Sequence, residues 1–219
     1  MIMSITATFS RSRGNHDWYD GLTSFLRVFH APRWIGCWKT QQRRSYFALD
    51  LPYKWWLWGV DTALEDDLDG AQIEYFRAAA EKLKEGDRVI FCVPNPVWSE
   101  NPELLTSDTT TRKSGDKFSI IHELAADRTK DYRVLLCLSG DLHHYARHET
   151  AGDEPHRQFI VCGGGGAFTL GTSLQPKSFD LPRGQSAQLK KCFPSDEESR
   201  AMRWGALLFP FTSPDLPPF

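Results

Sequence analysis

Two short polar segments carry residue types that metal-assisted chemistry uses. The first, Gly14-Asn15-His16-Asp17, precedes a segment at 18–29 whose composition predicts a helix. An asparagine carbonyl oxygen can bind a divalent cation, a histidine can act as a general acid, and a neighbouring carboxylate can orient that imidazole. The second, Gly140-Asp141-Leu142-His143-His144-Tyr145, follows an apolar run. Each segment alone also has an ordinary interpretation: a turn with a helix cap in the first, and two exposed loop histidines in the second.

Predicted strands position the second segment and two others. Apolar runs predict buried strands at 88–93, 133–138 and 158–162. A proline-rich segment, the Asp141–His144 segment and a run of four glycines at 163–166 follow these strands in turn. Because sites in open α/β sheets form beyond the carboxyl ends of strands, we expect the three strand ends to face one cleft. Asn15 and His16 are expected on a loop that enters a helix beside it.

The remaining pattern predicts further elements of an α/β fold. Two β-prone runs, 45–51 and 55–60, are separated by Pro52-Tyr53-Lys54 and predict a hairpin. Asp69 is expected to cap a helix over 70–84, which Gly86 would end. The polar stretch 101–115 predicts an exposed loop, and 117–126 returns to helical spacing.

Composition narrows the classes of protein. The chain has 219 residues and 41% hydrophobic content, enough for one sizeable core. Its net charge of −2 does not indicate a nucleic-acid surface. The five cysteines include no CxxC pair, which indicates reduced thiols. Residues 1–13 lack a signal-peptide pattern, and no apolar run is long enough to span a membrane. These features together predict a cytoplasmic protein without a membrane span. We expect a single partial domain over 1–200 and an apolar, proline-rich tail over 201–219 that packs on its surface.

Taken together, the two polar segments resemble the calcineurin-like metallophosphoesterase family. The chain is most similar to a bacterial branch with GNHDWYDGL, a QQRRSYFAL-type strand, WWLWG, GDxHHY and GGGGAF, which all occur here in that order between 14 and 168. The resemblance implies an α/β fold: the C-terminal portion of a four-layer metallophosphoesterase β-sandwich flanked by helices. It also implies a metal-dependent hydrolase of phosphate esters, a phosphatase or phosphodiesterase. Its cofactors would be divalent Mn, Fe or Zn, dinuclear in the family, and its substrate a phosphorylated small molecule or lipid.

The family's roles carry over to particular residues. Asn15 would bind metal, His16 would face the scissile phosphate as a catalytic residue, and Asp17 would orient that histidine. The family's late Gly-His-x-His motif reads Gly140-Asp141-Leu142-His143 here, so Asp141 and His143 would bind metal. The extra imidazole and a later arginine are candidate phosphate contacts: His144 and Arg147.

Three other features have both a functional and a structural interpretation. Asp61-Thr62 followed by Gln72 matches a family pattern but equally fits an ordinary strand, turn and helix. The glycine run at 163–166 could approach an anion, although a tight turn leaving the sheet is favoured. The tryptophans could form a stacking wall or a membrane belt, but a hairpin packed on the core is favoured: Trp34, Trp38, Trp55, Trp56 and Trp58.

The chain also departs from the family pattern. The family's Asp-x-His and Gly-Asp-x-x-Asp motifs lie upstream of Gly-Asn-His-Asp, yet residues 1–13 contain no Asp and no His. Pro94-Asn95-Pro96 stands where the family has its middle histidine. These departures predict an incomplete metal centre in a truncated domain, with a sheet edge exposed for self-association. Two hypotheses follow: a phosphate-ester hydrolase, or a non-catalytic remnant acting as a structural or interaction module.

Overall fold

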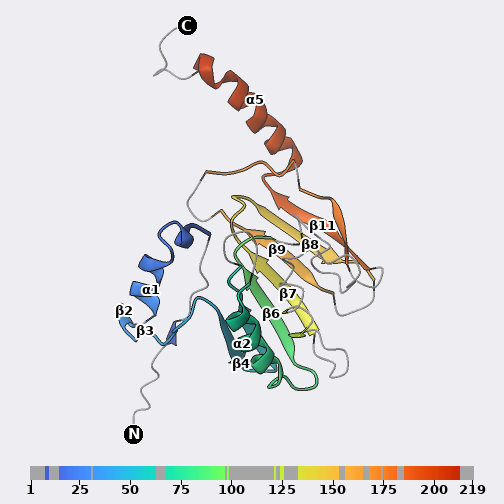
Figure 1. Ribbon diagram of the computed structural model, residues 1–219. Coiled ribbons are helices and arrows are strands. Elements are labelled where there is room, and N and C mark those ends of the chain that lie inside the picture. Colours follow the sequence, from blue (N-terminus) through green and yellow to red (C-terminus); the bar gives the residue numbers. More distant parts are fainter. Residues whose placement is uncertain are drawn as a thin grey trace.

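The computed structural model describes residues 8–9, 15–30, 32–62, 68–96, 98, 121, 124–125, 133–152, 156–164, 168–173, 175–181 and 185–212. Its centre is a mixed sheet of eight strands in the order β10-β11-β8-β9-β7-β6-β5-β4 (Figure 1). The strands are β4 (Phe47–Leu51), β5 (Trp55–Gly59), β6 (Arg88–Val93), β7 (Arg133–Ser139), β8 (Tyr145–Thr150), β9 (Gln158–Cys162), β10 (Ser178–Leu181) and β11 (Gln185–Phe193). The fold is therefore mixed α/β, as the sequence predicts.

Parallel pairing is confined to the middle of this sheet. Strands β5, β6, β7 and β9 pair in parallel, whereas β4, β8, β11 and β10 join by antiparallel pairing. The strands predicted at 88–93 and 158–162 form with those bounds, and the one predicted at 133–138 extends to Ser139. The three strand ends expected to face one cleft thus belong to adjacent parallel strands.

The core lies on one face of the sheet. Trp58, Phe91, Cys137 and Phe159 lie side by side across the four parallel strands and are essentially buried. Helix α2 (Gly70–Ala80) covers this face and places the Phe76 ring 5.0 Å from the Trp58 ring. Burying such aromatic side chains contributes several kcal/mol to stability, about 2–3 kcal/mol each. The opposite face carries half-buried aliphatic side chains, among them Leu57, Ile90, Leu136, Leu138 and Ile160.

The predicted hairpin and helix cap are confirmed. Strands β4 and β5 pair from Leu51–Trp55 to Phe47–Gly59, and Tyr53 and Lys54 turn the chain with positive φ angles of 64° and 63°. The Asp69 Oδ1 atom accepts a hydrogen bond of 2.7 Å from the Gln72 amide, as expected of an N-cap.

Helix α2 ends earlier than predicted, at Ala80 instead of 84. The amides of Lys82 and Leu83 turn back to carbonyls only three residues earlier, which tightens the chain out of the helix. Asp87 then holds this turn, because its Oδ2 atom accepts from the Lys84 amide at 2.9 Å and from Trp56 Nε1 at 3.0 Å.

The predicted helix over 18–29 is wrong in its first half. A 3₁₀ turn, η1 (Asn15–Trp18), comes first, and α1 (Thr23–Phe29) begins only after Leu22 adopts a φ of 63°. Leu22, Phe25 and Phe29 form a small apolar cluster of their own, apart from the main core. A three-stranded sheet stands beside this unit: β1 (Thr8–Phe9), β2 (Trp34–Ile35) and β3 (Trp38–Thr40).

Further predictions have mixed outcomes. Trp56 and Trp58 pack in the core as favoured, whereas Trp34 and Trp38 are exposed. Within the helix predicted at 117–126, the described residues Ile121, Leu124 and Ala125 are helical, and the loop predicted at 101–115 lies outside the described residues. All five cysteines are free thiols. Among the described residues, no helix combines the length and apolarity needed to cross a bilayer.

Four elements after residue 144 were not predicted, and one of them crosses the expected boundary at residue 200. Strands β8, β10 and β11 follow the second polar segment, and α5 (Asp196–Thr212) follows β11. Figure 1 shows α5 extending away from the sheet toward the C-terminus.

Candidate functional site

Hydrogen bonds to backbone carbonyls connect the ends of three parallel strands. The Pro94 carbonyl, just past β6, accepts from Ser139 Oγ at 3.0 Å and from the Gly140 amide at 3.2 Å, just past β7. The Gly163 amide, just past β9, donates to the His144 carbonyl at 3.2 Å. The three strand ends therefore lie together, with the histidine segment between the other two, while the cleft expected there stays a prediction.

The segment Gly140–His144 is a tight, strained turn. The Leu142 amide donates to the Gly140 carbonyl at 2.8 Å, and the His144 amide to the Leu142 carbonyl at 2.7 Å, so two three-residue turns follow each other. Asp141, at the centre of the first, has a φ of 61°. A non-glycine residue in this conformation costs on the order of 1 kcal/mol, and such strain concentrates at functional sites.

Gly163 packs directly against this turn. A Cβ atom placed on Gly163 would lie 2.0 Å from the Leu142 carbonyl oxygen and 2.6 Å from the Leu142 carbonyl carbon. The first residue of the glycine run is therefore needed for close backbone approach, which agrees with the favoured structural interpretation. Residues 165–167 of the glycine segment lie outside the described residues.

The two histidines of the turn are not exposed loop residues. His144 is only 5% exposed, and neither of its ring nitrogens has a hydrogen-bond partner among the described residues. Burial lowers the pKa of His144, which favours the neutral imidazole, the form that has a lone pair to offer. The buried Nδ1 atom of His143 likewise has no partner among the described residues, and its ring meets the Phe168 ring edge-on at 4.6 Å. The ordinary interpretation of this segment is thus wrong.

Arg147 lies on β8, away from the turn. Its Nη1 atom is 3.2 Å from Glu149 Oε2 and 3.2 Å from Gln158 Oε1, so the guanidinium is engaged on the half-buried face of the sheet. Its expected role as a phosphate contact stays a prediction.

The first polar segment forms the 3₁₀ turn η1. The Asp17 carbonyl accepts from the Leu22 amide at 3.1 Å, and the Asp17 side chain is half-buried. The side chains of Asn15 and His16 lie outside the described residues, so their expected roles stay predictions.

The Gln72 side chain holds the end of β5. The pattern of Asp61-Thr62 followed by Gln72 therefore has a structural role here. Its side-chain Oε1 accepts from the Asp61 amide at 2.7 Å, and its Nε2 donates to the Asp61 carbonyl at 2.8 Å. The side chain is 2% exposed, so both bonds form away from water. Helix α2 is thereby fixed to the same strand-end edge as the histidine turn.

Sequence reasoning missed His148, which lies in the middle of β8. Its ring is fully buried against Phe179, and Nε2 donates to the Pro176 carbonyl at 2.9 Å. The buried Nδ1 atom has no partner among the described residues, so a proton added there would lack an acceptor. This burial lowers the pKa of His148 below its ordinary value.

We expect stability to fall in acid partly because of His148. The unfolded chain binds a proton at a histidine pKa of about 6.5, whereas the folded chain binds it only at lower pH. The stability that neutral His148 contributes is therefore fully present above the pKa of the unfolded chain. This contribution is lost as the pH falls through the lowered pKa of the folded chain. Urea unfolding between about pH 7.5 and 5 should show this loss, and His148→Gln should make it smaller. An unchanged pH dependence in His148→Gln would contradict the assignment.

The described residues fit a metal in donor type but not in donor number. Imidazole and carboxylate groups at the turn are ligands of Zn²⁺, Mn²⁺ and Fe²⁺. Yet within the part of the chain that the structure describes, no three His, Cys, Asp or Glu side chains are grouped to hold a metal ion.

No protein-family model, curated protein or solved structure matches this chain.

Proposed function

We propose that the turn Gly140–His144 is part of a metal-dependent phosphoesterase site, and that the chain belongs to a hydrolase of phosphate esters. The observation that carries this proposal is the pair of imidazoles at the strand ends, with buried ring nitrogens that lack partners among the described residues. Buried polar atoms in proteins are nearly always hydrogen-bonded, so such a group needs an explanation. A bound cation is one, because neutral imidazole is the commonest metal ligand.

The residues of this turn divide into two roles under the proposal. Asp141 and His143, with Asn15, would hold the ion, and the buried His144 would supply a further imidazole at the same turn. A divalent ion bound there would polarise a phosphoryl oxygen of the substrate. His16, oriented by Asp17, would donate the proton to the leaving oxygen. Further donors must come from outside the described residues, since these alone group no three ligands.

The sheet is compatible with the proposed metallophosphoesterase sandwich. In a four-layer sandwich of two sheets between two helix layers, each sheet carries helices on one face and packs its other face on the second sheet. Here α2 covers one face of the sheet, and half-buried aliphatic side chains line the other. This arrangement supports one half of a four-layer fold.

Metal content tests the proposed function. The full chain, incubated with Mn²⁺, Zn²⁺ or Fe²⁺ and then desalted, should retain metal by elemental analysis. We expect His143→Ala and His144→Ala each to weaken metal binding by more than about tenfold. His30→Ala removes an exposed histidine beyond α1 and should leave metal binding unchanged. Metal-loaded protein should then hydrolyse a phosphate monoester or diester. Failure of the wild-type chain to retain any metal would overturn the proposal.

A non-catalytic module is the second candidate, favoured by the lack of a three-ligand group among the described residues. Its partner would be a second copy of the chain, paired through an outer strand of the sheet, β4 or β10. Light scattering that shows a dimer, together with no metal retention, would favour this candidate over the hydrolase.

A further inference from the structure

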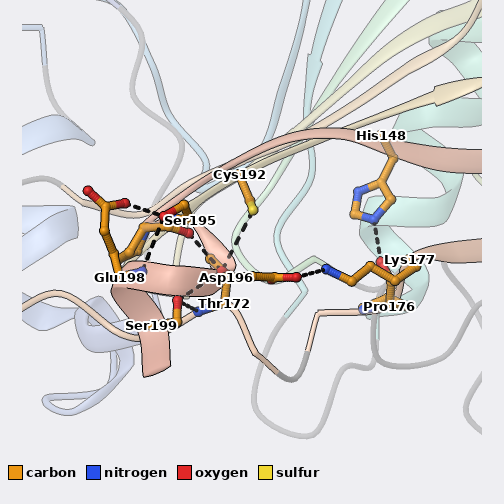
Figure 2. A network of polar contacts seen from close by, with 10 residues as sticks. His148, Thr172, Pro176, Lys177, Cys192, Ser195, Asp196, Glu198 and Ser199 are labelled. Atoms are coloured by element: carbon orange, nitrogen blue, oxygen red, sulfur yellow. Dashed lines mark hydrogen bonds and ion pairs between the residues drawn. The ribbon is translucent and has the colours of Figure 1, made fainter. Parts of the chain in front are cut away.

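Helix α5 is fixed to the body of the protein at its first turns. Thr172 and Ser199 are both buried, and the Thr172 amide donates to Ser199 Oγ at 3.0 Å. Thr172 Oγ1 donates to the Pro194 carbonyl at 2.7 Å, so one threonine links the loop after β9 to both sides of the helix start (Figure 2).

Capping interactions define where α5 begins. The Ser195 amide donates to Glu198 Oε2 at 2.7 Å, and the Glu198 amide donates to Ser195 Oγ at 3.2 Å, which together form a capping box. Lys177 Nζ lies 2.7 Å from Asp196 Oδ2, across from the same turn (Figure 2). These contacts hold the base of α5 and set its direction away from the sheet.

Polarity in α5 changes along the helix axis. All of its charged residues lie within 196–203, and the remaining nine residues, WGALLFPFT, carry none. On a helical wheel drawn at 100° per residue, the apolar positions in the sequence of this second part are distributed all around the axis. A helix that docks in a protein groove instead keeps its apolar residues on one stripe. A segment that is apolar all round suits a lipid environment.

Exposed apolar side chains mark the change in polarity and the base of the helix. Trp204, at the start of the uncharged part, is 67% exposed, and Met202 beside it is also exposed. Phe168, which is 69% exposed, precedes Thr172 in the loop tied to α5, and exposed Phe193 directly precedes Pro194. Tryptophan is enriched at the level of lipid headgroups, because its ring is apolar and its N–H is polar.

We propose that α5 docks on the surface of a lipid bilayer through its uncharged part, 204–212, with Trp204 at the headgroup level. Nine helical residues extend about 14 Å at 1.5 Å each. Because Asp215 follows the helix by only three residues, this part lies at the bilayer surface and does not cross a leaflet. The charged residues of 196–203 stay in water, and Phe168 and Phe193 contact the interface. Because the Phe168 ring also meets His143, the docked protein holds the candidate site beside the headgroups.

Vesicle flotation with the full chain tests this docking. The probes are vesicles of phosphatidylcholine alone and of phosphatidylcholine with phosphatidylglycerol. We expect the wild-type chain to float with vesicles, and Leu207→Glu combined with Leu208→Glu to reduce the bound fraction by more than about tenfold. As a matched control, Tyr53→Glu removes a 90% exposed aromatic side chain at the β4–β5 turn and should leave flotation unchanged.

A second measurement keeps the test independent of folding in the double variant. Brominated lipids should quench wild-type tryptophan fluorescence more than that of Trp204→Phe, because they reach Trp204 only if it lies in the bilayer. Absence of flotation, or equal flotation of wild type and the double variant, overturns the proposal. Light scattering that shows a dimer, lost in the double variant, with no vesicle binding would assign α5 to a second copy of the chain instead.

Discussion

Replacing Gly163 with alanine is expected to lower the free energy of unfolding by about 3 kcal/mol, the upper end for overpacking. The added Cβ would lie 2.0 Å from the Leu142 carbonyl oxygen, and that oxygen belongs to a backbone that cannot rotate away. Relief requires the histidine turn to move off the end of β9. This would break the 3.2 Å bond from the Gly163 amide to the His144 carbonyl.

Gly164→Ala is the matched control for this prediction. A Cβ on Gly164 meets nothing within 4 Å, so alanine there should change stability by about 0.5 kcal/mol or less. Urea unfolding of the two variants measures the difference. The proposed site adds a second measurement, since Gly163→Ala should also lose metal retention while Gly164→Ala keeps it. Equal stability of both variants would show that the turn does not pack on β9 as described.

The sequence predicts the centre of the fold because its parallel strands are apolar on both faces. Runs such as RVIFCV and RVLLCL need no alternation to be recognised, since both faces are covered or half-buried. From these strands and the polar residues after them, the meeting of three strand ends follows by the geometry of parallel sheets.

Strands that have polar residues at buried positions could not be predicted from apolar runs in the sequence. In β8, the buried positions are Ala146, His148 and Thr150, a set that carries no apolar alternation. In β11, Ala187 is the one core residue among the described strand positions, and lysines occupy two others. Tertiary packing decides such strands, because β propensity depends on the neighbours of each side chain.

The contacts between the glycine run, the histidine turn and the loop at 168–170 could not be predicted from the sequence either. The glycine run predicted a turn, but only the structure identifies Gly163 as the member that touches Leu142. The loop at 168–170 lies against the same turn, where the Phe168 ring meets the His143 ring and the Leu170 amide donates to the His143 carbonyl at 2.8 Å. Contacts between residues so far apart in sequence leave no local pattern to recognise.

Gln72→Leu is the second variant with a large expected effect, a loss of about 3 kcal/mol in the free energy of unfolding. Leucine fills similar space but leaves the Asp61 amide and carbonyl without the bonds of 2.7 and 2.8 Å that Gln72 provides. Each buried backbone group stripped of its partner costs about 1–3 kcal/mol. The variant should therefore be far less stable although leucine is the more apolar residue.

Glu74→Leu, on the exposed side of the same helix, is the matched control. It removes only a solvent-exposed ion pair with Arg77, which contributes about 0.5 kcal/mol or less. Hydrogen exchange adds a local readout, because the Asp61 amide should exchange much faster in Gln72→Leu than in Glu74→Leu. If Gln72→Leu instead proved as stable as wild type, the clamp would not hold the end of β5. The strand-end edge would then depend on the β6, β7 and β9 contacts alone. A large loss confined to Gln72→Leu would show that the glutamine after Asp61-Thr62 serves the fold and places β5 at the edge where the histidine turn lies.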